Sequence, residues 1–136
     1  MEVKIIGAGL AGSEAALQLA KRGFKVKLYE MRPKKTTGAH VGKDCAEFVC
    51  SNSLGSIDVT NASGLLKKEM QILGGELIEI AIKNSVPAGN ALAIAREDFS
   101  KEVTDLIEQN PNIELIREEI TEIPDGNVII ASGPLT

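Results

Sequence analysis

Two apolar strand patterns flank a helical pattern within the first thirty residues of the chain. Val3–Ile6 is an apolar run, and Lys25–Tyr29 alternates apolar with polar positions. Between them, apolar residues recur at helical spacing from about Leu10, and Gly23 follows as the expected helix end. This order predicts a strand, a helix and a second strand, which together form a βαβ unit of a parallel sheet.

The pattern becomes regular again after residue 64. A helix is predicted over Leu65–Ile82, with a break at Gly74-Gly75. Its apolar face consists of Leu66, Met70, Leu73 and Leu77. The further predicted elements are the strand Ala91–Ala95, the amphipathic helix Glu97–Gln109, the strand Ile113–Ile120 and the buried strand Val128–Ala131. We group residues 86–127 as an inserted strand–helix–strand segment.

Residues 33–64 are rich in Gly, Ser, Thr, Asn and Asp and show little periodicity. A structureless stretch of about thirty residues inside a compact domain is usually functional or disordered. We therefore expect a cofactor or active-site loop here, with one short helical piece over Cys45–Val49.

Length and composition favour one domain without a membrane segment. The chain has 136 residues, and no apolar run approaches the ~20 residues that span a bilayer. Its first residues lack the pattern of a signal peptide. Cys45 and Cys50 are the only cysteines, and without a secretory signal they are not expected to form a structural disulfide. We expect a cytoplasmic protein.

Charge is unevenly distributed around a net value of −4. Basic residues concentrate within Lys21–Lys35, whereas the chain after residue 50 is acidic. The basic cluster could contact RNA phosphates, but a solvated helix end and strand edge is the favoured interpretation. Charge alone does not predict an RNA partner.

A GxGxxG turn connects the first strand to the first helix. Gly7 permits the tight turn, Gly9 lets the backbone approach a pyrophosphate, and Gly12 lets the helix pack closely. The amino end of the helix would face the phosphates. The candidate cofactor-binding residues of this turn are Gly7, Ala8, Gly9, Leu10, Ala11 and Gly12. The alternative is a glycine turn that merely connects strand and helix; the complete pattern favours a dinucleotide-binding Rossmann-like α/β fold.

Glu30 ends the second strand, where a ribose-binding carboxylate is expected. A carboxylate accepts hydrogen bonds from ribose hydroxyls and repels a 2′-phosphate, so NAD or FAD is favoured over NADP. Arg32 is open to three interpretations: it could pair with a phosphate, stack on adenine or be solvated.

The last predicted strand is followed by two small residues, Ser132 and Gly133. Parallel sheets bind ligands at the carboxyl ends of their strands, so we expect these residues to bring backbone to the cofactor. Few parallel strands are predicted, and we therefore expect more sheet or another domain beyond Thr136.

Six segments together resemble one known family over essentially all 136 residues. They are GAGLAGSEAA, YEMRPKKTTGAH, AEFVCSNSLGS, GLLKKEM, VPAGNALAIAREDFS and VIIASGPLT. In this order they resemble the N-terminal portion of the folate- and FAD-dependent tRNA (uracil-5-)-methyltransferases, also called the Gid family. The GxGxxG part is common to many flavoproteins, whereas CSNSL and EMRP are more specific.

The resemblance implies a fold, an activity and site residues. The fold would be a Rossmann-like FAD-binding domain of the glutathione-reductase type, incomplete in this chain. The family methylates carbon 5 of a T-loop uridine in tRNA, with methylenetetrahydrofolate as one-carbon donor, FAD as cofactor and NAD(P)H as reductant. The GxGxxG turn would hold the FAD pyrophosphate, Glu30 the ribose, and Arg32 would lie near the adenine. Cys50 matches one of two catalytic cysteines; the second has no counterpart here.

A thiol suits this chemistry because thiolate addition at carbon 6 of uracil activates carbon 5, and a second group must remove the carbon 5 proton. Which of these duties would fall to Cys50 stays open, as do the roles of Cys45 and His40. Two other functions also stay open. One is another flavoprotein, either an enzyme of tRNA carboxymethylaminomethyl-uridine modification or an NADH oxidoreductase, against which CSNSL and EMRP argue. The other is a cofactor-binding fragment without activity of its own.

Overall fold

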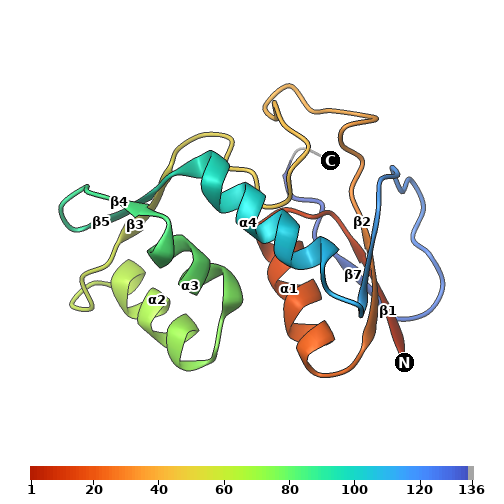
Figure 1. Ribbon diagram of the computed structural model, residues 1–136, viewed down its shortest axis with the longest axis horizontal. Helices are drawn as coiled ribbons and strands as arrows, with labels where there is room; N and C mark the ends of the chain where they lie inside the picture. The colour runs from red at the N-terminus through yellow and green to blue at the C-terminus, as the bar shows by residue number, and fades with distance from the viewer. Residues whose placement is uncertain (135–136) are drawn as a thin grey trace.

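The computed structural model describes residues 1–134 and contains a four-stranded parallel sheet at one end of the molecule (Figure 1). The strand order is β6-β2-β1-β7. The strands are β1 (Glu2–Ile6), β2 (Lys25–Tyr29), β6 (Ile113–Ile116) and β7 (Val128–Ile130), and every neighbouring pair is parallel. Helix α1 (Leu10–Lys21) connects β1 to β2. The predicted βαβ unit and α/β class are confirmed.

One face of this sheet builds the core. Ile5 and Leu28 lie opposite each other in the β1–β2 register and are completely buried. Helix α1 covers them with its small residues Ala16 and Ala20, which allow close approach of helix and sheet. The alternate strand positions Lys4 and Lys27 are only half-buried on the other face. The periodicity of two along each strand thus separates a covered face from a more open one.

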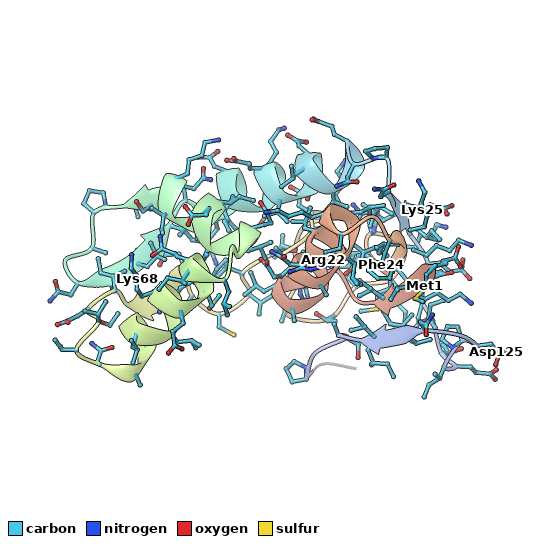
Figure 2. All side chains as sticks on the ribbon, turned by 90° about the horizontal axis from the view of Figure 1, so that it is seen from below. Met1, Arg22, Phe24, Lys25, Lys68 and Asp125 are labelled. Carbon is cyan, nitrogen blue, oxygen red and sulfur yellow. The ribbon has the colours of Figure 1, made fainter. Side chains whose placement is uncertain are left out.

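A second lobe lies beside the parallel sheet (Figure 1). It contains an antiparallel sheet of order β3-β5-β4 and two helices. Its elements are β3 (Ser53–Ser56), α2 (Ala62–Ile72), α3 (Glu76–Lys83), β4 (Ser85–Val86) and β5 (Ala91–Ile94). Helix α4 (Arg96–Glu108) runs from this lobe to the parallel sheet and packs Phe99, Val103 and Ile107 into the core. Figure 2 views the molecule from below and shows the second lobe and the parallel sheet at opposite ends: Lys68 on α2 lies far from Met1 and Lys25.

The break at Gly74-Gly75 is confirmed, because α2 ends before it and α3 begins after it. The predicted apolar face is wrong for α2. Leu66, Met70 and Leu73 are exposed by 56%, 37% and 80%, and only Leu77 of this set is buried. The two helices have different axes, so a helical period that runs through the break does not define one buried face.

Three other local predictions need correction. Residues 45–49 form a turn and irregular chain instead of a short helix. Strand β6 ends at Ile116, four residues early. Strand β7 is not buried: within residues 1–134 it pairs only with β1, and Ile130 is 59% exposed. Edge strands pair on one side only, so their apolar residues need not be covered.

The segments grouped from the sequence are distributed across both lobes. Residues 33–64 contain β3 and the start of α2 in addition to irregular chain. Within residues 86–127, β5 belongs to the antiparallel sheet and β6 to the parallel one. Among the described helices, none has the length and apolar character needed to cross a membrane.

Candidate functional site

The carboxyl ends of the parallel strands meet the glycine turn at one edge of the sheet (Figure 1). The Gly7 N–H donates to the Tyr29 carbonyl at 2.8 Å, and the Ala131 N–H donates to the Ile6 carbonyl at 2.8 Å. The turn is therefore fixed between β2 on one side and the end of β7 on the other. Ligands of parallel α/β sheets bind at this edge.

Gly7 and Gly12 are required by close packing. Gly7 has φ +99°, and a Cβ there would lie 2.5 Å from the Ala131 carbonyl oxygen and 2.9 Å from the Ser132 Cα. A Cβ on Gly12 would lie 1.8 Å from the Gly7 carbonyl oxygen. Real Cβ atoms do not approach oxygen so closely, so these two positions admit only glycine without backbone movement.

Gly9 differs from both: within residues 1–134, and apart from Gly9 and its two chain neighbours, no atom lies within 4 Å of a Cβ built there. It is the N-cap residue of α1 and, as a glycine, provides no side-chain cap to this helix. The first turn of α1 contains no acid, whereas α3 and α4 begin with acids such as Glu76 and Glu97. The positive end of α1 is thus not offset by an acid of its own first turn, and an anion bound beside Gly9 would be attracted to it.

Glu30 lies beside this turn and is nearly buried, at 6% exposure. One carboxylate oxygen accepts the Ala8 N–H at 3.0 Å, and the other accepts the Arg32 N–H and Nε–H at 3.1 and 2.9 Å. Burial raises the pKa of the carboxyl, but the hydrogen bonds from Arg32 and Ala8 outweigh it and hold the pKa below 4.5. Glu30 is therefore an oriented carboxylate at neutral pH.

Arg32 is enclosed by acceptors and only 2% exposed. Its Nε donates to Glu30, and its Nη1 donates to Glu47 at 2.5 Å and to the Gly42 carbonyl at 3.4 Å. The interpretation of a solvated Arg32 is wrong, because burial and two ion pairs hold the guanidinium in place. Sequence reasoning missed Glu47, which lies in an irregular loop where no period marks a partner.

The loop after β2 is anchored to both the glycine turn and α4. The Ala46 N–H donates to the Ala8 carbonyl at 2.8 Å, and the Cys45 N–H donates to Thr104 Oγ1 at 2.8 Å. Two residues before Cys50, the Phe48 ring meets Phe99 edge to face at 5.4 Å. These contacts bring the loop to the same edge of the sheet as the glycine turn.

The two thiols lie in opposite environments. Cys45 is completely buried, and this burial raises the pKa of its thiol to about 11. Cys50 is exposed, and both cysteines are free. Cys50 follows the anchored Ala46 by four residues, which places it within ~14 Å of that position, measured between Cα atoms.

A cavity of about 550 Å³ lies next to Cys50 in the chain. Its lining consists of Ser51, Asn52 and the residues Ile94–Asp98 at the start of α4. The Ile94 N–H donates to the Asn52 carbonyl at 2.8 Å, so the strand β5 fixes the residues that follow Cys50. Ligand pockets commonly have volumes of roughly 300–1,000 Å³, and this one is large enough for a nucleoside.

The other residues singled out from the sequence lie at the end of β7, in the loop after β2 and at the amino end of the parallel sheet. Ser132 and Gly133 are exposed and follow β7 beside Gly7. His40 lies half-buried in the loop, with Nδ1 2.6 Å from Thr37 Oγ1. Arg22 and Lys25, labelled in Figure 2, lie between the end of α1 and the start of β2, whereas the glycine turn follows the carboxyl end of β1. Lys25 Nζ donates to Asn112 Oδ1 at 2.8 Å, which agrees with a polar helix end and strand edge.

Residues 2–135 match the family described as "Glucose inhibited division protein A". A protein of Fusobacterium nucleatum is 64% identical over 136 residues, and one of Persephonella marina is 57% identical over 137. Both are named methylenetetrahydrofolate–tRNA-(uracil-5-)-methyltransferase TrmFO, and both alignments cover 99% of this chain. The chain spans only about 31% of the length of these curated relatives.

Among solved structures, GidA of Aquifex aeolicus matches with a TM-score of 0.71 at 21% identity. The match covers 93% of this chain and 21% of that one. It supports the Rossmann-like fold inferred from the strand order.

Proposed function

The chain belongs to the glucose inhibited division protein A family, and from this premise we propose that it forms the FAD-binding N-terminal part of a folate-dependent tRNA (uracil-5-)-methyltransferase. The reaction assigned to the whole protein transfers a one-carbon unit from methylenetetrahydrofolate to carbon 5 of a T-loop uridine in tRNA. NAD(P)H is the reductant in this proposal. The compartment included in this proposal is the cytoplasm.

The open space at Gly9 beside an oriented Glu30 is the observation that carries the cofactor proposal. We call the turn Gly7–Gly12 together with Glu30 the cradle. It fits a dinucleotide because a Cβ at Gly9 would enter open space, whereas a Cβ at Gly7 or Gly12 would collide with neighbouring backbone. Ala8 and Leu10 flank Gly9 in the chain, and Leu10 and Ala11 begin α1, so the backbone of these residues would border a cofactor bound there. Ser132 and Gly133 would border the bound cofactor from the end of β7.

Glu30 would bind the adenosine ribose. A carboxylate offers about four acceptor sites, and hydrogen bonds from Ala8 and Arg32 use three of them. The remaining site is on the oxygen that accepts from Ala8, and a ribose hydroxyl can donate there without displacing Arg32. A negative charge at this position disfavours a 2′-phosphate, which supports FAD over NADP.

Cys50 would act on the uridine. Its exposure next to the cavity of Ser51 and Asn52 supports contact with a substrate, whereas Cys45 is closed off by burial. As nucleophile, Cys50 would add to carbon 6 of the base; as base, it would remove the carbon 5 proton. When bound, the reduced flavin supplies the electrons that convert the transferred methylene unit to a methyl group.

The test is to reconstitute the purified chain with FAD and to measure bound-flavin absorbance, then uridine methylation with tRNA and methylenetetrahydrofolate. We expect the chain to bind FAD without methylating tRNA, and a protein of the length of the relatives to do both. A chain that recovers no flavin contradicts the cofactor proposal. A full-length protein that binds flavin but modifies a different uridine position would identify another flavoprotein of tRNA modification.

A further inference from the structure

We propose that Arg32 is a positioning residue that ties the ribose-binding carboxylate Glu30 to the loop that carries Cys50. The inference rests on the proposed function for the ligand of Glu30 and for the role of Cys50. It makes cofactor binding and Cys50 placement interdependent. No direct contact of Arg32 with the cofactor is needed, and at 2% exposure Arg32 has almost no surface to offer one.

The geometry is a chain of two ion pairs through one guanidinium. Nε lies 2.9 Å from a Glu30 oxygen, and Nη1 lies 2.5 Å from a Glu47 oxygen. The Glu47 side chain is 17% exposed, so both pairs are shielded from bulk water. Ion pairs at such sites depend strongly on one another, because removal of the cation leaves two carboxylates close together without a counter-charge.

Glu47 in turn holds the backbone of the loop. Its Oε1 accepts the Val41 N–H at 2.9 Å, and both of its oxygens lie 3.2 Å from the Gly42 nitrogen. Arg32 Nη1 also donates to the Gly42 carbonyl. The segment from 41 to 47 is therefore closed around Arg32, and Cys50 follows Glu47 by three residues.

An arginine is specifically suited to this position. The two carboxylates are bound by different nitrogens, Nε and Nη1, of one planar group. A lysine ammonium carries the same charge but is a single point donor, so it cannot reproduce both contacts from one position. Arg32→Lys should consequently keep the net charge of the chain but lose the link between Glu30 and Glu47.

The expected consequence is reciprocal coupling. If FAD binding fixes Glu30, it also fixes Arg32, Glu47 and the loop, so Cys50 should become less reactive towards an alkylating agent when FAD is bound. By linkage, a change at Glu47 should alter the affinity for FAD, although Glu47 is not part of the cradle. A loop that is independent of the cradle would show neither effect.

The experiment measures iodoacetamide alkylation of Cys50 by mass spectrometry and FAD affinity by flavin fluorescence, in the same chain. Arg32→Lys and Glu47→Gln should each weaken FAD binding about tenfold, a factor within the usual range for coupling between two linked sites. Both should raise the Cys50 alkylation rate severalfold and abolish its dependence on FAD. Protection of Cys45 reports that the variants are folded. Lys35→Met, which removes the exposed Lys35–Glu119 pair, is the matched control.

Wild-type FAD affinity in Glu47→Gln, with Cys45 protected, would overturn the proposal. If the wild-type chain binds no FAD, the proposed function fails, but the connection can still be tested without a cofactor. In that case Glu30→Gln should raise the Cys50 alkylation rate in the wild-type background and leave it unchanged in the Arg32→Lys background. Equal effects in both backgrounds would overturn the role of Arg32.

Discussion

Cys45 and Cys50 are five positions apart in one loop, yet Cys45 is completely buried and Cys50 is exposed. The cause is local anchoring. The Cys45 N–H is bound to Thr104 on α4, and the next residue, Ala46, is bound to the glycine turn. Ala46 adopts φ +54°, a conformation that is uncommon outside glycine and is held here by these contacts. The chain then leaves the core before Cys50.

The two thiols should therefore differ in reactivity. At pH 8, iodoacetamide should label Cys50 and leave Cys45 unmodified until the protein is unfolded, because the pKa of Cys45 is about 11 and its sulfur is inaccessible. Peptide mass spectrometry with and without denaturant measures this difference. Labelling of both cysteines at equal rates in the native protein would contradict the buried position of Cys45.

Gly9 and Gly12 of the turn should respond differently to substitution. Gly9→Glu should abolish flavin binding while the melting temperature stays near that of the wild type, because the side chain enters open space and carries a charge that repels phosphate. Gly12→Ala should instead destabilise the fold by about 3 kcal/mol through overpacking against the Gly7 carbonyl. Thermal unfolding and flavin titration of both variants separate the two effects. Normal flavin affinity in Gly9→Glu would disprove the role of the turn.

The sequence predicted the parts of the structure that depend on short-range pattern. The strand–helix–strand order, the glycine turn and the placement of Glu30 follow from periods and spacings within thirty residues, and the helix over 97–109 was predicted within one residue at each end. Contacts between irregular segments leave no such signal. The Arg32–Glu47 pair joins residues fifteen positions apart in a loop, where neither a helical nor a strand period applies.

The prediction that Leu66, Met70 and Leu73 form a buried helix face is wrong for a related reason. An apolar period indicates which residues share a helix face, but it does not determine what that face contacts. In the structure the two lobes place α3, and not α2, against α1 and α4, so Leu77 and Ile78 are buried instead. The position of an exposed apolar face depends on long-range packing that no window of sequence contains.

The difference in burial between core and exposed apolar residues predicts unequal losses of stability when their side chains are truncated. Phe99→Ala should destabilise the chain by about 3–5 kcal/mol, because Phe99 is completely buried in the core. Leu73→Ala removes a side chain that is 80% exposed and should change stability by less than about 0.5 kcal/mol. Urea unfolding curves of the two variants measure both values. A large loss in Leu73→Ala would mean that this residue is covered in solution.

Acid should weaken the chain through the carboxylates around Arg32. Burial raises the pKa of Glu47, but the Val41 and Gly42 N–H groups and Arg32 outweigh it, so its pKa, like that of Glu30, lies below the usual 4.5 in the folded state. A carboxyl with a lowered folded pKa stabilises the fold above its unfolded pKa, and this stabilisation is lost as the pH falls through the folded value. The melting temperature should thus be flat from pH 8 to 6 and fall below about pH 4.5.

The variant Glu47→Gln isolates the contribution of this site to the acid response. It removes one of the two titrating groups, so its melting temperature should be lower than that of the wild type at pH 7 and the difference should shrink as both proteins are taken to pH 3. Glu122→Gln removes the same charge from an exposed position and is the matched control. Calorimetric scans across this range provide the comparison. A difference between Glu47→Gln and wild type that stays constant down to pH 3 would show that Glu47 is not held as a carboxylate by Arg32 and the loop backbone.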